Sequence, residues 1–458
     1  MRIVIFACCV LWGCTSENNL GNTRQILHST RWATTLGSIH EDGARSVVID
    51  PAGDVVAGGF FTGTVDFGVE TLSTSHTAGW VSKRSGIDGS ARWTITLGTE
   101  MSAYADVAGV ATTGDGSVIV AGTYSGDLHL EGQTLHGPGL TTGSDCFVAK
   151  YNPAGQLQWV RNLGPSTVSN LTSLAASHDG RIAIIGAYQG VLQLPNGNYS
   201  AVDHDPFLVL FDANGQMLWG VTSQNPGGTV GVQGLFAGAV AMTAEDDVIL
   251  AGDISFIQRL AGTFLEPNAR ISQYAARFTL DGHLLWAGVL GPDGVERASG
   301  PIAVDPTGGI VMTSTRRDSG SLDNGLPGID SLDPNGHAVW TRQAASGSAV
   351  ADSIAVLGDG TVVTGGSTAG YSVDFGSGAL DGCMYLAAHN RDGTLADVVS
   401  YVPRGPSCGE AFPWGLAGGP GGAVALAGVV GTAADFGTGT LRFAGATDAM
   451  IVMLDTVP

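Results

Sequence analysis

The stretch TRWATTLG, residues 30 to 37, has the pattern of a half-buried β-strand: a Trp, then alternating small and polar residues, closed by Leu-Gly. It stands alone behind a polar leader. A single strand buries little apolar surface by itself, so it needs a partner elsewhere in the chain. The identity of that partner decides the fold.

The composition is that of a folded chain with many tight turns. Of the 458 residues, 44% are apolar and 13% are charged, and 70 are Gly. The formal net charge is −21. An acidic surface repels phosphate backbones, so we expect no nucleic-acid partner. The only lysines are Lys83 and Lys150, which argues against lysine-based catalysis.

The first fourteen residues, MRIVIFACCVLWGC, have the pattern of a targeting leader. Arg2 precedes an apolar run over residues 3–13, and Cys14 follows Gly13. This resembles the lipobox of bacterial lipoproteins, which implies a signal peptide over 1–13, a lipid on Cys14 and a flexible linker over 14–29, with a reach of roughly 20 Å. An ordinary secretory signal is the alternative. Thr15, in place of Asp after the cysteine, favours the outer membrane.

A motif centred on tryptophan recurs along the rest of the chain. TRWATTLG at 30 is followed by ARWTITLG at 91, LQWVRNLG at 157, MLWGVTS at 217, LLWAGVLG at 284 and AVWTRQA at 338. We interpret these tryptophans as packing residues of the repeat: Trp32, Trp93, Trp159, Trp219, Trp286 and Trp340. All but Trp32 have a turn Gly four residues earlier, and a further turn, RDGTLADV, puts Asp397 where the Trp would be.

Each repeat contains four strand-like runs. In the second repeat they are DVAGVATTG, SVIVAGTY, CFVAKYN and LQWVRNLG, and runs like the second occur seven times in all along the chain. Turns containing Gly and Asp separate the runs, as in antiparallel hairpins. The pattern predicts an all-β fold, a seven-bladed β-propeller over residues 30–458 with four antiparallel strands per blade. A β-solenoid is the alternative, but its coils are shorter and parallel.

Two segments resemble the propeller repeats of bacterial surface and secreted proteins: DPAGDVVAGG at 50–59 and DCFVAKYNPAGQLQW at 145–159. The resemblance covers about 30–458 and implies the same fold. It is weakest in the fifth repeat, where the third strand, near LPGIDSL, contains Pro327. Proline cannot donate to a strand ladder, so we expect this strand to be poorly formed.

The seventh repeat lacks a fourth strand, because DAMIVMLD supplies its third. We expect TRWATTLG to supply the fourth, so that the N-terminal strand closes the last blade and covers the apolar edge AMIVML. Tight turns then lie on one face of the ring, with both termini, and long loops lie on the other. We expect the long-loop face to look away from the membrane and to bind partners.

Beyond the leader and Cys14, the cysteines are Cys146, Cys383 and Cys408. Three cysteines allow one disulfide at most and leave one thiol. Cys383 and Cys408 both belong to the long-loop face, so a disulfide between them is the candidate pairing.

Few residues suggest a metal site or a catalytic site. Asp66, Asp374 and Asp435 recur in loops such as TVDFGVETL, but one carboxylate per repeat does not make a calcium site, so we expect a short β-hairpin in each loop. DHD at 203–205 and HEDG at 40–43 are weak metal candidates, since Asp205 aligns with Asp145 and Asp448 as a repeat position. No GxSxG, HExxH, CxxC pair or P-loop occurs. We therefore expect no metal, cofactor or catalytic residues.

These observations favour a non-catalytic, lipid-anchored propeller of the cell envelope, at the outer membrane, which is monomeric and binds a protein or glycan through its long-loop face. The turn-plus-Trp strands also resemble those of pyrroloquinoline-quinone propellers and of the propeller lipoprotein in the outer-membrane barrel assembly machinery. Those families usually have eight shorter blades. The alternatives are a propeller enzyme, quinoprotein-like or glycan-active, or an outer-membrane assembly scaffold.

Overall fold

The computed structural model describes residues 27, 29–100, 103–140, 143–163, 167–224, 235–317, 325–368, 370–402 and 408–456. Within these ranges the chain is built of β-strands, and its helical segments are two 3-10 turns, η1 (Cys408–Glu410) and η2 (Pro420–Gly422). None of the helices in these ranges has the length and apolar character needed to span a membrane. The predicted signal peptide, residues 1–13, and Cys14 lie outside the described residues.

Antiparallel four-stranded units repeat along the chain. The first contains β2 (Gly43–Ile49), β3 (Val55–Asp66), β4 (Thr71–Arg84) and β5 (Ala91–Leu97). The next contains β6 (Ala103–Thr112), β7 (Val118–Leu130), β9 (Asp145–Tyr151) and β10 (Leu157–Asn162). It is followed by β11 (Thr167–Ala176), β12 (Ile182–Leu194), β13 (Gly197–Phe211) and β14 (Met217–Gln224).

The same order continues in the second half of the chain. One sheet contains β15 (Leu235–Met242), β16 (Val248–Ile254), β19 (Ser272–Phe278) and β20 (Leu284–Leu290). Another contains β21 (Glu296–Val304), β22 (Ile310–Arg317), β23 (Leu326–Leu332) and β24 (Ala338–Gln343). The next contains β26 (Val350–Val356), β27 (Val362–Ser367), β30 (Met384–His389) and β31 (Leu395–Ser400). In the last, β32 (Ala411–Gly418), β33 (Ala423–Val430) and β36 (Asp448–Asp455) are joined by β1 (Ser29–Leu36).

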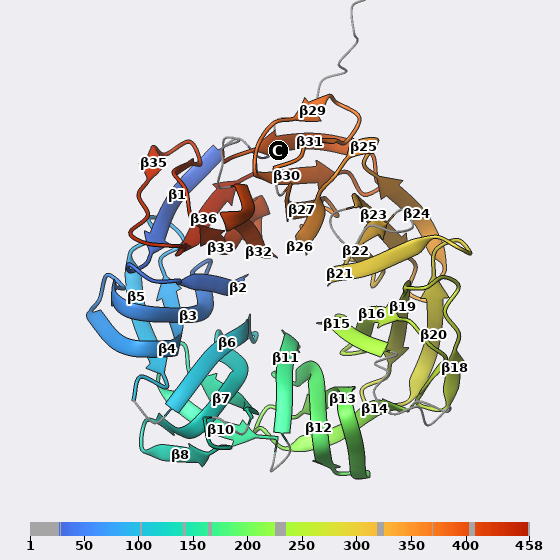
Figure 1. The fold of residues 1–458 in the computed structure, drawn as a ribbon, viewed down its shortest axis with the longest axis horizontal. Coiled ribbons are helices and arrows are strands. Elements are labelled where there is room, and N and C mark those ends of the chain that lie inside the picture. Colours follow the sequence, from blue (N-terminus) through green and yellow to red (C-terminus); the bar gives the residue numbers. More distant parts are fainter. Residues whose placement is uncertain are drawn as a thin grey trace, which may run out of the picture.

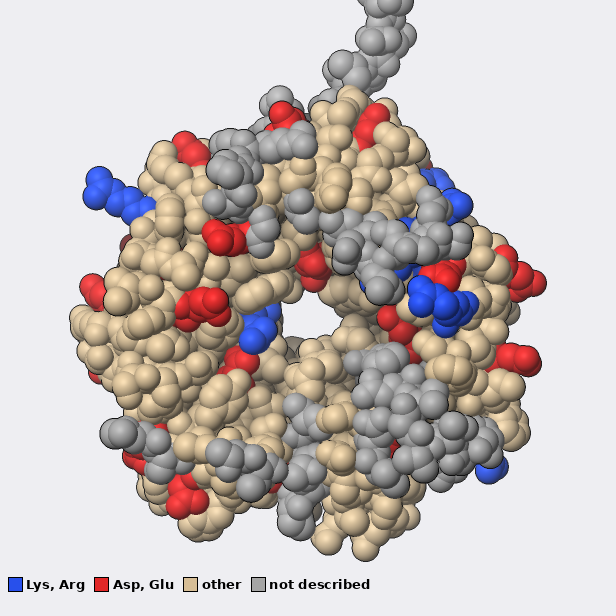
Figure 2. Space-filling model, in the orientation of Figure 1, with Lys and Arg blue, Asp and Glu red and all other residues tan. Residues whose placement is uncertain are grey.

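The sheets stand around a central opening in a propeller-like arrangement (Figure 1), and the space-filling view shows that the opening is not filled by side chains (Figure 2). The first strand of each sheet lies nearest the opening: β2, β6, β11, β15, β21, β26 and β32. Each of these strands contacts the next along the chain, and β32 contacts β2.

The third strand of each sheet is almost completely buried where it pairs with the fourth, since neighbouring sheets cover both of its faces. β9, β19 and β30 are buried at every position, which explains their continuous apolar runs. The turn that follows β9 shows how polar residues end such a run. Asn152 Oδ1 accepts hydrogen bonds from the N–H groups of Ala154 and Gln156, both 3.0 Å. Gly155 closes the turn with a φ of 84°, a conformation that favours glycine.

The strand TRWATTLG finds its partner at the other end of the chain. β1 pairs antiparallel with β36 from Ser29 opposite Asp455 to Leu36 opposite Ala449. Trp32 and Leu36 belong to an apolar cluster that also contains residues of β3, β4, β33 and β36. β1 therefore covers the edge of β36 and packs against the sheet of β2–β5.

Several loops contain the β-hairpins predicted from the sequence. Asp66 pairs with Thr71 where β3 turns into β4, and β7 pairs with β8 (Gln133–His136). The remaining short strands are β17 (Gln258–Leu260), β18 (Thr263–Leu265), β25 (Ser346–Gly347), β28 (Val373–Asp374), β29 (Ala379–Leu380), β34 (Ala434–Asp435) and β35 (Thr440–Leu441). β28 pairs with β29, and β34 pairs with β35, so the hairpin predictions for these loops are confirmed.

The expectation that Pro327 disrupts its strand is wrong. β23 pairs along its length with β22, and with β24 from Gly328 onward. Pro327 is the second residue of the strand, where its missing N–H costs little, and its carbonyl still accepts a hydrogen bond of 2.9 Å from the N–H of Ala344. A proline at the end of a central strand is therefore compatible with the ladder.

Candidate functional site

The recurring tryptophans lie at the joints between sheets. Each indole N–H donates to a backbone carbonyl in the turn between the third and fourth strands of the following sheet. Trp159 donates to Ala213 at 3.1 Å, and its ring lies so close to Gly215 that a Cβ there would be 2.7 Å away. Gly215 has a φ of 77°, so the turn needs glycine for two reasons. The other pairs are Trp32–Gly86, Trp93–Pro153, Trp219–Leu280, Trp286–Pro334 and Trp340–Arg391.

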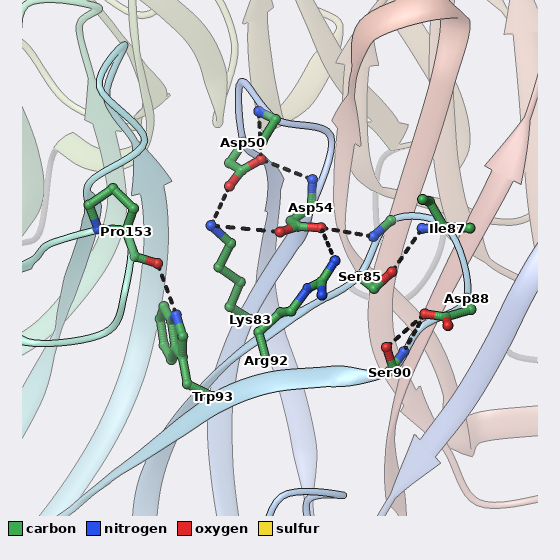
Figure 3. A network of polar contacts seen from close by, with 12 residues as sticks. Asp50, Asp54, Lys83, Ser85, Ile87, Asp88, Ser90, Arg92, Trp93 and Pro153 are labelled. Atoms are coloured by element: carbon green, nitrogen blue, oxygen red, sulfur yellow. Dashed lines mark hydrogen bonds and ion pairs between the residues drawn. The ribbon is translucent and has the colours of Figure 1, made fainter.

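The two lysines occupy equivalent buried positions opposite these tryptophans. Lys83 pairs with Trp93 across β4 and β5, and Lys150 pairs with Trp159 across β9 and β10. Lys83 Nζ lies 2.6 Å from Asp50 Oδ2, and both side chains are buried (Figure 3). The Asp50 carboxylate also accepts backbone N–H groups of its turn. This buried ion pair is part of the repeat and offers no accessible group to a substrate.

The carboxylates considered as metal ligands instead hold turns. Asp66 accepts the N–H of Gly68, and Asp374 and Asp435 do the same in their hairpins. Asp42 of HEDG is buried and accepts the N–H groups of Ser38 and Thr62. Asp205 of DHD lies opposite Tyr188, just as Asp145 lies opposite Tyr124. Within the described ranges no three His, Cys, Asp or Glu side chains come close enough to hold a metal ion.

The cysteines lie inside the fold. Cys383 and Cys408 form a disulfide that ties the start of β30 to the segment before β32. Cys146 is a buried thiol in β9, and burial raises its pKa well above the usual value. A thiol in this protonated, inaccessible state is a packing residue and not a nucleophile.

The innermost strands border the central opening (Figure 1). The register of each of them shifts at a β-bulge, once or twice along the strand, where the strand carries an extra residue relative to its neighbour. In three successive sheets the bulges contain a charged or a large aromatic residue: Asp352, Trp414 beside Pro413, and Arg45. In the remaining sheets the bulge residues are small and uncharged: Ala108, Ser169, Thr172, Gly238, Gly300 and Pro301.

Five residues from three neighbouring sheets form a cluster that we call the channel-mouth cluster: Arg45, Phe60, Asp106, Phe412 and Trp414. Arg45 Nε lies 3.0 Å from both carboxylate oxygens of Asp106, and Nη2 lies 2.9 Å from Oδ2. The guanidinium stands 4.8 Å from the Phe60 ring centroid and 5.4 Å from that of Trp414. Trp414 in turn stacks on Phe412 at 6.3 Å. Contacts on two sides fix the guanidinium in one orientation.

Arg45 and Asp106 lie in the first halves of β2 and β6, toward the end of these strands where the long loops are expected. The Arg45 side chain is 39% exposed, and its Nη1 has no partner among the described residues. Gly43 permits the packing, since a Cβ there would lie 2.8 Å from Phe60 and 2.9 Å from Trp414. The site thus presents a free hydrogen-bond donor beside aromatic surface, which suits a ligand with acceptor oxygens.

Sequence reasoning did not predict any residue of this cluster. Arg45, Asp106 and Trp414 occupy positions that differ from sheet to sheet, so they carry no repeat signal. The signal that could have found Arg45 and Trp414 is a charged or aromatic residue at a strand position where the other repeats have a small one.

A second feature is a cavity of about 90 Å³ between the sheets of β21–β24 and β26–β31. His389, Tyr385, Phe375 and Arg342 are among its lining residues. His389 is 4% exposed and its Nδ1 has no hydrogen-bond partner within the described structure. Burial, with a smaller contribution from Arg342, lowers the pKa of His389 to about 4. The residues at the same register position in three other sheets are Tyr151, Phe211 and Phe278.

We expect His389→Phe to stabilise the protein, because it fills the cavity and removes an unpaired buried nitrogen. Since the folded pKa lies below the ordinary value of about 6.5, the unfolded chain takes up a proton first as pH falls, and stability is lost between pH 6.5 and 4. His389→Phe should therefore gain about 2 kcal/mol over the wild type on moving from neutral pH to pH 5. Urea unfolding at pH 7.5 and pH 5 measures this difference. Parallel losses in the two proteins would contradict the assignment.

No family model matches the chain. Part of it is similar to the regulatory protein FlaEY of Caulobacter vibrioides, with 26% identity over 178 residues. That match covers 38% of this chain and 18% of the relative, so the chain spans less than a fifth of that protein's length.

Three solved structures share a distant likeness in fold. One is a Dyadobacter fermentans protein of unknown function, 10% identical with a TM-score of 0.41 over 76% of this chain and 95% of that one. The quinohemoprotein alcohol dehydrogenase of Comamonas testosteroni is 12% identical, with a TM-score of 0.37 over 93% and 75%. The Hadza microbial sialidase Hz136 is 11% identical, with a TM-score of 0.38 over 94% of both chains. At these scores the likeness assigns no activity to this chain.

Proposed function

We propose that the chain is a seven-bladed β-propeller in which β1 is the fourth strand of the last blade. Two observations support this proposal. β1 pairs with β36 in the same sheet as β33 and β32, and β32 lies against β2, the inner strand of the first sheet. In this arrangement the first and last strands of the chain hold the ring together.

We infer further that the propeller is a lipoprotein of the cell envelope, anchored through Cys14 after removal of residues 1–13. The support is the leader sequence, with its short apolar run and Gly13-Cys14. β1 begins at the end of its sheet that carries the tight turns, so the anchor joins that face. The long-loop face, with the channel-mouth cluster, then points away from the outer membrane.

The function we propose is non-catalytic binding of a protein or glycan partner at the long-loop face. The observation that carries this proposal is the channel-mouth cluster, where Asp106, Phe60 and Trp414 hold Arg45 in place with one nitrogen free. A fixed guanidinium loses little entropy on binding, and the aromatic surface beside it adds apolar contact area. These are the properties of a recognition site. The described residues around it include no pairing of a nucleophile with a base.

The test compares Arg45→Ala with the wild type for binding to purified envelope polysaccharides and to solubilised envelope proteins on a sensor surface. Arg92→Ala is the matched control, because Arg92 is 51% exposed and pairs with Asp54 near the tight turns. We expect Arg45→Ala to weaken binding at least tenfold, while Arg92→Ala binds like the wild type. Equal binding by all three proteins would place the site elsewhere.

A further inference from the structure

One joint between sheets lacks the tryptophan contact described above. In β31 the residue at the Trp position is Asp397, which pairs with Ala388 just as Trp159 pairs with Lys150. The following sheet is that of β32, β33, β36 and β1. Its third and fourth strands, β36 and β1, come from opposite ends of the chain, so no turn connects them. An indole at position 397 would therefore find no turn carbonyl to accept its N–H.

The group that occupies this place is the backbone of Leu27, two residues before β1. The N–H of Leu27 donates to Asp397 Oδ2 at 2.9 Å, across 370 residues of sequence. Its carbonyl accepts a hydrogen bond from the Tyr401 hydroxyl at 2.6 Å. At the other joints the indole N–H of the fourth strand donates to a backbone carbonyl of the next sheet. Here the direction is reversed, because the backbone N–H of Leu27 donates and the side chain of Asp397 in the fourth strand accepts. A carboxylate is the suitable side chain for that role.

Leu27 is also held by apolar packing. Its side chain is fully buried in a cluster that includes Cys383, Val402 and Phe436. The Tyr401 ring lies 4.9 Å from the ring of Phe436, and the Phe436 carbonyl accepts the hydroxyl of Thr30 in β1. Both backbone groups and the side chain of Leu27 are thus satisfied by the two sheets that flank it.

We propose that Asp397 and Tyr401 form a latch that clamps the chain at Leu27 and fixes the point where the leader leaves the ring. This step rests on the proposed function, in which Cys14 carries the lipid anchor. Only the residues between Cys14 and Leu27 then separate the membrane from this fixed point. The latch thereby restricts the orientations in which the long-loop face is presented. The clamp itself is independent of the anchor and is testable without it.

Hydrogen exchange on the full chain tests the latch, read on the amide of Leu27 and on the peptide over 448–455. We expect Leu27 to be protected in the wild type and to exchange about tenfold faster in Asp397→Ala, since one charge-assisted hydrogen bond is lost. Tyr401→Phe keeps the ring contact and should speed exchange by a smaller factor. Asp392→Ala, in the adjacent turn, is the matched control and should leave Leu27 unchanged.

Three results would overturn the latch. The first is an unprotected Leu27 amide in the wild type, and the second is exchange at Leu27 that is the same in Asp397→Ala as in the wild type. The third is an equal acceleration over 448–455 in Asp397→Ala, which would make Asp397 a general support of the sheet. Hydrogen exchange at Leu27 and over 448–455 does not depend on whether Arg45→Ala weakens partner binding. The latch and the proposed binding function can therefore fail independently.

Discussion

Deleting residues 30–37 is expected to abolish soluble folded protein. The deletion removes nearly all of β1 and leaves β36 as an unpaired edge with a continuous apolar sequence. It also removes Trp32 and Leu36 from the cluster that joins the last sheet to the first. Expression of the truncated chain, followed by the soluble yield and by thermal melting, measures the effect.

The matched control for this deletion is removal of residues 15–26, which precede the first described residue, Leu27. We expect that variant to be as soluble as the full chain and to melt at the same temperature. If the chain without 30–37 is soluble and melts normally, β1 is dispensable and the ring is closed in some other way.

The second large effect is expected from Trp159→Ala. Trp159 is 9% exposed and belongs to the cluster between the sheets of β6–β10 and β11–β14. Truncation leaves a cavity and removes the hydrogen bond to Ala213, which together should cost about 3–5 kcal/mol. The midpoint of urea unfolding reports this loss.

Trp159→Phe separates the two contributions of the indole. It keeps an aromatic ring against Gly215 but loses the N–H donor, so we expect a loss of about 1 kcal/mol beyond any packing change. Midpoints of Trp159→Ala and Trp159→Phe that are both equal to the wild type would mean that the tryptophans do not stabilise the joints.

The repeated parts of the fold were predictable because each sheet packs against its neighbour through the same contacts, so the same residue types recur at fixed spacings. A Trp four residues after a turn Gly marks a fourth strand. The structure explains why both residues recur, because the Gly of each turn leaves room for the Trp of the preceding sheet, as Gly215 does for Trp159. The strand that contains Pro327 was predicted wrongly. A sequence pattern does not reveal that the proline falls at the end of the strand, where its missing donor is harmless.

The candidate site was not predictable, because it is built from residues that break the repeat. Arg45 and Trp414 are brought together by the contact between β2 and β32, which are far apart in sequence. Asp397 was visible as an exception to the Trp pattern, but its partner, Leu27, is 370 residues away. A single sequence gives no means of pairing such distant exceptions.

The strong negative charge also has a structural origin. Many aspartates accept backbone N–H groups within tight turns, as Asp50, Asp212 and Asp333 do. These carboxylates are needed for the repeat itself. The net charge of −21 therefore says less about partners than it would in a protein with few turns.

The pairing of β1 with β36 is tested most directly by a disulfide between Ser29→Cys and Asp455→Cys, which lie opposite each other. Cys14→Ser keeps the chain unlipidated, and Ser29→Cys with Asp281→Cys, in a distant turn, is the control pair. Mild oxidation of the folded protein should link 29 to 455 in most molecules, seen as faster migration without reductant, and should not link 29 to 281. Failure of 29 and 455 to cross-link, or equal cross-linking of both pairs, would contradict a ring closed by its first and last strands.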